Sequence, residues 1–225
     1  MTWDCRGQKQ RQSPFFDFSC NRCNMSTIVS IKKENGGMLV VTTRDGDGKR
    51  EHYRISERAY REGCDLPVGA EADDDVTSLL SRENGHCEAL RAALRIIGYS
   101  DNSESRLRTK LISKGYSREA VAYAVREVIG RGYLDEGRQI EIAVLNLANR
   151  EFLGKYKIIP RLATKGYRAA DISRVYSALV SRGDIDESKN AGELIARRLP
   201  NGGDRDEVNA LLHKYGYREN FSDYD

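Results

Sequence analysis

Six basic side chains recur with one spacing in two places along the chain. They are Arg106, Lys110 and Lys114 and, 51 residues further on, Lys157, Arg161 and Lys165. Residues four apart share a face of an α-helix, so each trio predicts a row of positive charge. Such like charges repel one another by about 0.2–0.5 kcal/mol per pair, which indicates a use beyond folding. The row could follow a phosphate backbone or the acidic groove of a protein partner.

Other basic and aromatic residues lie close to the two trios in the sequence. The basic ones are Arg108, Arg118, Arg131, Arg168 and Arg182, of which the first four complete the predicted binding surface. The aromatic ones are Tyr116, Tyr133 and Tyr167, and each follows a glycine. That position favours packing at a helix end over stacking on bases. The alternative for any single basic residue is the solvated face of an ordinary helix.

The positive charge of the chain is concentrated around these trios. Residues 105–182 contain 16 Lys and Arg against 7 Asp and Glu, although the whole chain carries a net charge of only +3. The rest of the chain is therefore acidic. This asymmetry predicts an anionic partner for the middle of the chain.

Catalytic and metal sites have little support in the sequence. The three histidines, His52, His86 and His213, have no evident triad partners, and no glycine loop suited to phosphate is present. Cys20 and Cys23 have the spacing of a zinc half-site, but a second half-site is missing. We therefore expect no enzyme activity, no metal and no cofactor.

The basic trios belong to a block of sequence that is repeated. Lys-Gly-Tyr at 114–116 returns at 165–167, and Leu-Asp-Glu at 134–136 returns as Ile-Asp-Glu at 185–187. A third, worn copy contains Lys-Tyr-Gly-Tyr at 214–217. A repeat of this length predicts similar units stacked in a row, which bind partners through their surfaces.

Apolar residues at helical spacing predict three helices in each complete module. One buried stripe comprises Val121, Val125, Val128 and Ile129, and its copy comprises Ile172, Tyr176, Leu179 and Val180. The expected helices are 88–98, 104–114 and 118–130, then 136–153, 157–165 and 168–181, then 187–199 and 204–214. We expect Leu111 and Leu162 to be buried, and Lys110 and Arg161 to face solvent.

Helix ends are marked by glycine and serine. The glycines expected to stop helices in the left-handed conformation are Gly115, Gly132, Gly166, Gly183 and Gly216. Ser103 and Ser117 are candidate N-caps. Pro160 requires its helix to begin near Ile158 or to bend in its first turn, because proline has no amide hydrogen.

The N-terminal part has a different pattern. Residues 27–31, 38–42 and 52–55 alternate like strands and are separated by Gly, Asn and Asp, which predicts an antiparallel β meander. Three strands need a partner layer, so we expect helices after Ser56 to cover them. The run Asp73 to Asp75 predicts a helix start rather than a metal site, because no other ligand is suitably spaced.

These patterns predict a mainly α protein with tandem three-helix modules and a small β meander. The expected divisions are 1–26 (a tail or a misassigned start), 27–86, 87–134, 135–185 and a truncated module at 186–225. No apolar run approaches the ~20 residues of a membrane span, and no secretory signal is evident. Five cysteines without a disulfide framework suit a reducing compartment, so we expect a cytoplasmic protein.

The order and spacing of these features resemble the RecX family, bacterial regulators of the recombinase RecA, over about residues 88–183. The resemblance is carried by Ser103, Leu107, Leu111, 114–116, 121–129 and 132–136, and then by Gly154, Ile158, Leu162 and 165–167. The departures from the family pattern are Glu136 in place of Asp, Gln139-Ile140 in place of Phe-Ala, and Pro160 within a helix.

The resemblance implies an elongated, curved monomer that lies in the groove of the RecA filament on single-stranded DNA. There it would hinder ATP turnover, filament extension or strand exchange, in the setting of recombination, DNA repair and the SOS response. Such binding needs no catalytic residue and can engage several protomers at once. Two alternatives remain: a sequence-independent DNA-binding repeat protein with weak direct affinity for DNA, and a helical adaptor for another partner.

Overall fold

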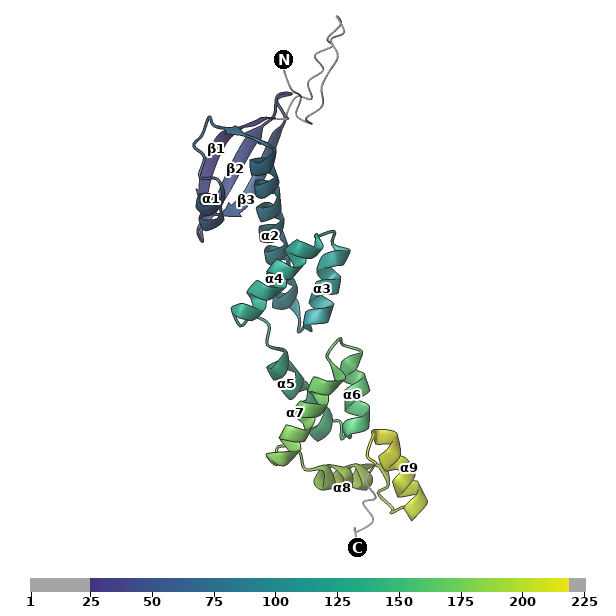
Figure 1. The fold of residues 1–225 in the computed structure, drawn as a ribbon. Helices are drawn as coiled ribbons and strands as arrows, with labels where there is room; N and C mark the ends of the chain where they lie inside the picture. The colour runs from purple at the N-terminus through teal and green to yellow at the C-terminus, as the bar shows by residue number, and fades with distance from the viewer. Residues whose placement is uncertain (1–24, 219–225) are drawn as a thin grey trace, which may run out of the picture. The chain divides into compact units, whose positions relative to one another are not determined.

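The computed structural model describes residues 25–218 (Figure 1). The predicted tail therefore lies almost entirely outside the described residues, as do Cys20 and Cys23. The chain divides into two compact units, residues 1–81 and 82–225. We describe each unit by itself.

The first unit is built on an antiparallel sheet. Its strands are β1 (Ser26–Glu34), β2 (Met38–Arg44), β3 (Arg50–Ser56) and β4 (Glu71–Ala72), in the order β3-β2-β1-β4. The predicted three-strand meander is confirmed, with strands longer than expected. β4 was not predicted, because a strand of two residues shows no periodicity in the sequence.

The sheet packs on its helical neighbours as expected. Val41 and Ile55 project from the sheet into a core that also contains Tyr60 of α1 (Glu57–Gly63) and Leu80 of the next helix. All four are at least 96% buried, with exposures of 0%, 0%, 4% and 0%. This arrangement gives the three strands the apolar layer that a small sheet requires.

The helix after β4 is much longer than predicted. α2 spans Asp74–Tyr99, whereas the sequence predicted a helix start at Asp73 to Asp75 and a separate helix at 88–98. The Oδ1 atom of Asp73 accepts the amide hydrogen of Val76 at 2.9 Å, so the aspartate run begins a helix as predicted. Weak helix formers near position 85 hid the continuity. The predicted division between residues 86 and 87 falls inside α2.

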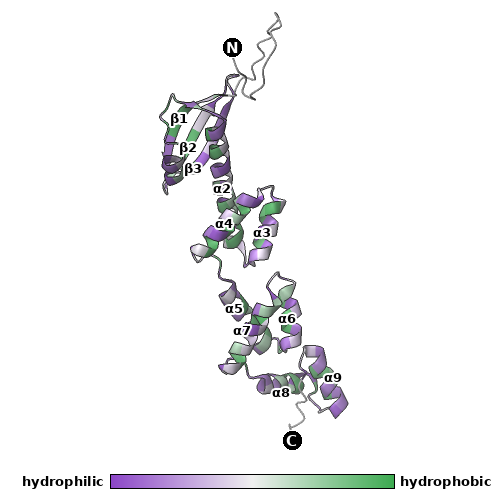
Figure 2. Cartoon of the chain, viewed as in Figure 1, coloured by the Kyte–Doolittle hydropathy of each residue, from purple (hydrophilic) through white to green (hydrophobic). Residues whose placement is uncertain are grey.

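The second unit contains the rest of the helices. They are α3 (Glu104–Ser113), α4 (Arg118–Gly130), α5 (Glu136–Asn149), α6 (Lys155–Ala163), α7 (Ala169–Ser181), α8 (Glu187–Arg198) and α9 (Arg205–Tyr215). Apolar and polar residues share each of these helices, as expected of amphipathic helices around small cores (Figure 2). The predicted three-helix pattern of the first two modules is confirmed.

Each module has its own apolar core. The first gathers around Leu111, the second around Leu162, and the third joins α8 and α9 through Leu194 and Leu212. Both leucines predicted to be buried are fully inaccessible, at 0%. The prediction for Ile129 was wrong: it is 43% exposed. Neighbouring helical residues point about 100° apart, and Val128 occupies the inward position.

The predicted caps are confirmed, but the first alternative for Pro160, a helix start near Ile158, was wrong. The hydroxyls of Ser103 and Ser117 accept amide hydrogens from the first turns of α3 and α4, each at 3.2 Å. α6 begins at Lys155 rather than near Ile158, so Pro160 lies inside the helix. The missing proline amide affects the carbonyl of Tyr156, in the first turn, where side chains reach solvent.

Candidate functional site

The N-terminus of α3 lies against the C-terminal end of α6. Ser103 donates its hydroxyl hydrogen to the carbonyl of Lys165 at 3.0 Å. The guanidinium of Arg106 donates to the carbonyl of Thr164 at 3.3 Å. Gly166 has φ +90°, and a Cβ atom there would overlap the Ser103 hydroxyl. Only glycine allows this approach, since it has no Cβ and accepts positive φ.

The same contact recurs between α6 and α9. The amide of Gly154 donates to the carbonyl of Tyr215 at 2.9 Å. A Cβ atom on Gly216, at φ +93°, would lie 2.6 Å from the amide nitrogen of Lys157. Gly154 stands 51 residues after Ser103, and so occupies the same position in the repeat. We call these two equivalent contacts the α3/α6 joint and the α6/α9 joint.

Both joints place a helix C-terminus against a helix N-terminus. The free carbonyls at one end meet the free amides, or the capping hydroxyl, at the other. The partial negative charge of one end also faces the partial positive charge of the next. α9, α6 and α3 therefore follow one another in this order along one side of the second unit (Figure 1).

The α3/α6 joint brings the two predicted trios together. Lys165, at the end of α6, and Arg106, in the first turn of α3, both lie at this joint. We call the combined set the basic row; in spatial order it is Lys157, Arg161, Lys165, Arg106, Lys110 and Lys114. All six side chains are exposed. What the sequence presents as two separate trios is one surface feature.

A groove of about 740 Å³ runs beside the α3/α6 joint. Four members of the basic row line it: Arg106, Lys110, Arg161 and Lys165. Arg138 of α5 adds a fifth cation, and Asp101, Asp135 and Glu151 add carboxylates. Lys157 lies next to Arg161 at a neighbouring hollow on α6. The groove thus combines both signs of charge.

Two exposed apolar side chains also line the groove. Tyr133 is 55% exposed and Ile142 is 52% exposed. The packing role predicted for tyrosines after glycine therefore does not hold for Tyr133. It does hold for Tyr167, which is 8% exposed and donates its hydroxyl to Gln139 at 2.9 Å. Exposed aromatic and aliphatic groups among cations are typical of protein interfaces.

The cations of the basic row differ in how they are paired. Arg161 holds both oxygens of Glu151 at 2.5 and 3.2 Å. The Lys110 ammonium donates to the side-chain oxygen of Asn102. Within residues 25–218, Lys114, Lys157 and Lys165 form no ion pair. These three lysines are therefore available to an anionic partner without breaking an internal bridge.

The other four predicted site residues are not part of the row. Arg108 pairs with the carboxylate of Glu104, and Arg131 with that of Glu127, each at 2.7 Å on its own helix. Arg118 and Arg168 are exposed at the N-termini of α4 and α7, and neither lines the groove. These four arginines were predicted to belong to the surface because they lie near the trios in the sequence. In the structure they are not part of the basic row.

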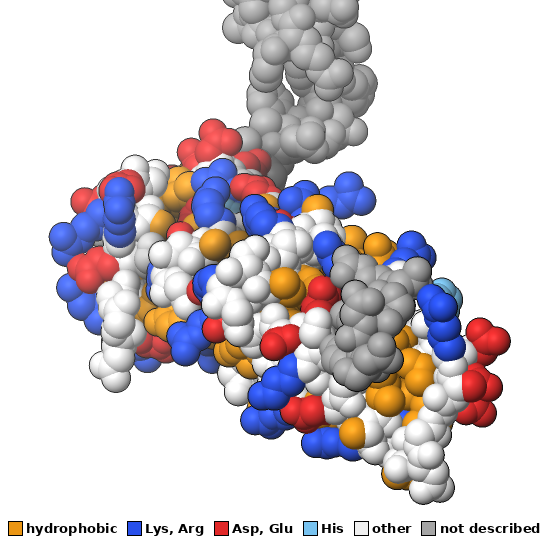
Figure 3. Space-filling view, turned by 90° about the horizontal axis from the view of Figure 1, so that it is seen from below, with side chains coloured by type: hydrophobic (Ala, Val, Ile, Leu, Met, Phe, Trp, Pro, Cys, Tyr) orange, Lys and Arg blue, Asp and Glu red, His pale blue; other side chains and the backbone are white. Residues whose placement is uncertain are grey.

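Sequence reasoning missed Arg138, which lines the groove from α5. A signal was present, because Lys189 stands 51 residues later and is also basic. On the face drawn in Figure 3, blue and red side chains alternate rather than forming one positive field. Positive and negative side chains are thus mixed on this face.

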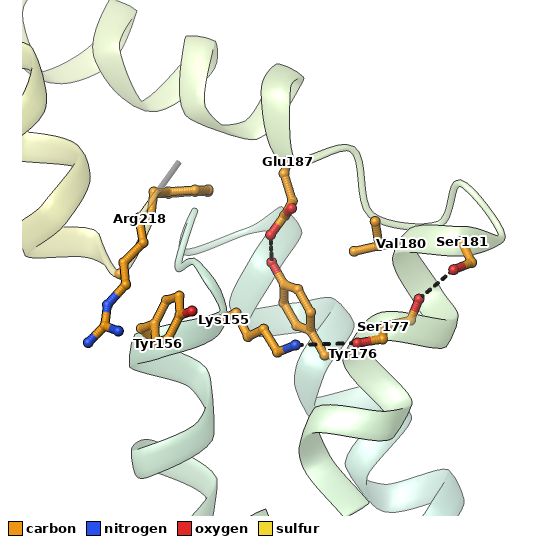
Figure 4. Close-up of a pocket in the computed structure, with 10 residues that line it drawn as sticks. Lys155, Tyr156, Tyr176, Ser177, Val180, Ser181, Glu187 and Arg218 are labelled. Atoms are coloured by element: carbon orange, nitrogen blue, oxygen red, sulfur yellow. Dashed lines mark hydrogen bonds between the residues drawn. The ribbon is translucent and has the colours of Figure 1, made fainter. Parts of the chain in front are cut away.

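A smaller cavity, of about 330 Å³, lies where α6, α7, α8 and the end of α9 meet (Figure 4). The Tyr176 hydroxyl donates to Glu187 at 2.6 Å, and the Lys155 ammonium lies 3.4 Å from the Ser177 hydroxyl. Burial, and then the bond to the carboxylate, raise the pKa of Tyr176. The bond from Tyr176 of α7 to Glu187 of α8 links the second and third modules.

In the part of the chain that the structure describes, no helix combines the length and apolar character needed to cross a membrane. No group of three or more possible metal ligands occurs among the same residues.

Comparisons with known proteins agree with the resemblance. Residues 89–127 match the family model described as RecX, first three-helix domain. The regulatory protein RecX of Clostridium tetani is 24% identical over 181 residues, which cover 79% of this chain and 77% of that protein. That of Trichlorobacter lovleyi is 28% identical over 146 residues, with coverages of 62% and 94%.

A third relative is matched over a shorter segment. The regulatory protein RecX of Pelodictyon phaeoclathratiforme is 28% identical over 93 residues, so the match spans 41% of this chain and 58% of that relative.

Solved structures show the same fold. A crystal structure of regulatory protein RecX superimposes with a TM-score of 0.65 at 20% identity, covering 86% of this chain and 95% of that one. The crystal structure of RecX from Lactobacillus salivarius gives a TM-score of 0.51 at 17% identity, with coverages of 60% and 90%.

Proposed function

The chain belongs to the RecX family of regulatory proteins, and we propose that it binds the RecA filament on single-stranded DNA without catalysing a reaction. Binding inhibits ATP hydrolysis by the filament, its extension and strand exchange. The observation that carries this proposal is the basic row, which continues across the α3/α6 joint. Each trio alone spans about 12 Å, at about 1.5 Å per helical residue.

The length of the basic row fits a partner that is itself extended, such as a filament. Two trios in series can engage adjacent protomers of a filament, and the second contact then forms at high effective concentration. The unpaired lysines at 114, 157 and 165 supply the attraction for acidic groups on the protein surface. A monomer can act in this way, because no second copy is needed to complete the row.

The groove favours protein over nucleic acid as the direct contact. Asp101, Asp135 and Glu151 lie among its cations and would repel a phosphate backbone. Tyr133 and Ile142 offer apolar area of the kind that is buried at the centre of a protein interface. A protein surface with mixed charge matches this lining better than a uniform polyanion does.

The test is ATP hydrolysis by preformed RecA filaments on single-stranded DNA, with this protein added at amounts well below those that would coat the DNA. The proposal predicts that hydrolysis falls at these low ratios. If hydrolysis stays constant until the DNA is saturated, competition for phosphates explains the effect and the proposal is wrong.

Direct, sequence-independent DNA binding is the second candidate, favoured by the three unpaired lysines. If all six cations of the row contacted phosphates of a single strand, log K would fall against log salt with a slope of about −4. Fluorescence anisotropy of labelled DNA without RecA measures this slope. Binding that is weak and less dependent on salt than this supports the filament as the partner.

A further inference from the structure

The second helices of the three modules are α3, α6 and α9. In each joint, the C-terminal end of one of these helices contacts the N-terminus of another. The end of α6 receives Ser103, and the end of α9 receives Gly154. The equivalent end of α3 is open: Gly115 has φ +89°, as its counterparts do, yet a Cβ atom built on it meets no atom within 4 Å. The same structural element is therefore occupied twice and empty once.

The carbonyls at this open end show the same difference. At the α3/α6 joint, the carbonyls of Thr164 and Lys165 accept hydrogen bonds from Arg106 and Ser103. Their counterparts 51 residues earlier are the carbonyls of Ser113 and Lys114. No donor from another helix reaches these two among residues 25–218.

The tyrosine after the open end is also more exposed than its counterparts. Tyr167 and Tyr217 are 8% and 5% exposed, whereas Tyr116 is only half-buried. Ile112, in the last turn of α3, is 52% exposed. An exposed isoleucine and a half-buried tyrosine beside free carbonyls give this end both an apolar and a polar means of holding a neighbour.

We infer that the C-terminal end of α3, residues 112–116, is a docking site for the N-terminus of a helix in the partner protein. This inference rests on the proposed function and names a contact by which the filament is held. A free helix C-terminus carries partial negative charge, and a helix N-terminus carries the complementary charge. Lys114 ends the basic row at this position, so the docking site continues the proposed interface.

The geometry of the filled joints defines the chemistry of the docked helix. The incoming N-cap is serine in one joint and glycine in the other. Both are small and allow backbone amides or a hydroxyl to reach the carbonyls. The partner helix therefore begins with a small N-cap residue, and its first-turn amides point at the end of α3.

A second copy of this chain does not provide that helix through α9. The Asp204 side chain caps α9, and the Glu207 side chain accepts the amide hydrogen of Asp204 at 3.3 Å in return. The Asp204 carboxylate has no hydrogen to donate to a carbonyl, in contrast to the Ser103 hydroxyl, which caps α3 and also donates to Lys165. A carboxylate at the N-cap would also face the carbonyls of α3. The array is closed at α9 and open at α3.

Photo-crosslinking tests the inference in the full-length protein. Ile112 is replaced by p-benzoylphenylalanine, with the same replacement at Ile129 in the last turn of α4 as the control, since Ile129 is 43% exposed. Each protein is bound to RecA filaments, irradiated and mapped by mass spectrometry. We expect the probe at 112 to crosslink RecA within the first turn of a helix that has a small N-cap residue.

A second variant, Gly115→Asn, adds a side chain to the open end with less strain than most residues would cause, because asparagine tolerates positive φ better than they do. Its matched control is Gly202→Asn, at φ +79° and also with nothing within 4 Å. We expect roughly tenfold weaker retention on filaments for Gly115→Asn, and wild-type retention for the control. Both variants should lower the melting temperature by a similar small amount, because both glycines have positive φ.

The outcomes separate the inference from the proposed function. If the protein sediments with filaments but the probe at 112 crosslinks no helix start, or if Gly115→Asn binds normally, the docking site is wrong and the filament remains the partner. If the unmodified protein does not sediment with filaments, both are wrong. Crosslinking of one copy to another would replace RecA by a second copy as the occupant and overturn the inference.

Discussion

Two glycine-to-alanine substitutions should have different costs if the α3/α6 joint holds the modules together. Gly115 and Gly166 have nearly the same φ, +89° and +90°, so Gly115→Ala and Gly166→Ala share a conformational strain of about 1–2 kcal/mol. The new methyl group enters open space at position 115. At position 166 it overlaps the hydroxyl of Ser103.

The excess cost at Gly166 follows from what Ser103 does. Its hydroxyl donates to the carbonyl of Lys165 and accepts from the amide of Arg106, so moving it breaks a hydrogen bond and a helix cap. A hydrogen bond contributes about 0.5–1.5 kcal/mol and an N-cap about 0.5–2 kcal/mol. We therefore expect Gly166→Ala to cost about 1–3 kcal/mol more than Gly115→Ala.

Urea unfolding followed by circular dichroism at 222 nm measures the difference, with both variants compared under the same conditions. Hydrogen exchange in the first turn of α3 should also accelerate in Gly166→Ala alone. A double-mutant cycle adds a stricter check: Ser103→Ala should cost less in the Gly166→Ala background than in the wild type. Equal losses at the two glycines, or additive effects in the cycle, would refute the joint.

Three further predictions concern charge, core and pH. Lys165→Glu should reduce inhibition of RecA ATP hydrolysis without changing the melting temperature, whereas Lys189→Glu, a control that is also exposed but lies outside the groove, should leave inhibition intact. Leu162→Ala should lower the free energy of unfolding in urea by about 2–5 kcal/mol, because the leucine is fully buried, and a loss below 1 kcal/mol would contradict that burial. Burial raises the pKa of Tyr60 to about 12, so its contribution to stability is complete below about pH 10 and is lost as the pH rises towards 12. Alkaline unfolding of Tyr60→Phe should lack this loss, and identical alkaline profiles for the two proteins would rule it out.

The two basic trios could be predicted because helical spacing and the repeat are both visible in the sequence. The joint that merges them could not, since Ser103 and Lys165 lie 62 residues apart. Gly166 was correctly predicted to end a helix, but the sequence does not show which atom approaches it. The length of α2 was missed for another reason: packing holds residues with low intrinsic helix propensity in a helix.

The sequence also did not show which cations line the groove. Arg108 and Arg131 carry the right charge, but each is paired on its own helix, and that pairing depends on rotamers that the sequence does not specify. Arg138 was overlooked, although it reaches the groove from another helix. Charge can be read from the sequence, whereas which charges converge depends on how the modules join.

The α6/α9 joint also explains why two lysines in the first turn of α6 do not destabilise this helix. α6 begins Lys-Tyr-Lys at 155–157 and has no acidic residue there, in contrast to α3 with Glu104 and α4 with Glu119. Cations at a free helix N-terminus are unfavourable by about 0.3–1 kcal/mol each. Here the carbonyl end of α9 abuts that terminus and offsets the partial positive charge.

Replacing Lys157 with glutamate should therefore change stability little in the intact protein. Gly216→Ala forces the two helices apart, because its Cβ atom would lie 2.6 Å from the Lys157 amide nitrogen. In that background Lys157→Glu should become stabilising, by about 0.3–1 kcal/mol for each of the two steps, loss of the cation and gain of the anion. Thermal unfolding of the four proteins measures this coupling. Equal stabilisation with and without Gly216→Ala would mean that α9 does not neutralise the partial positive charge at the start of α6. The presence of Lys157 in the first turn of α6 would then need another explanation.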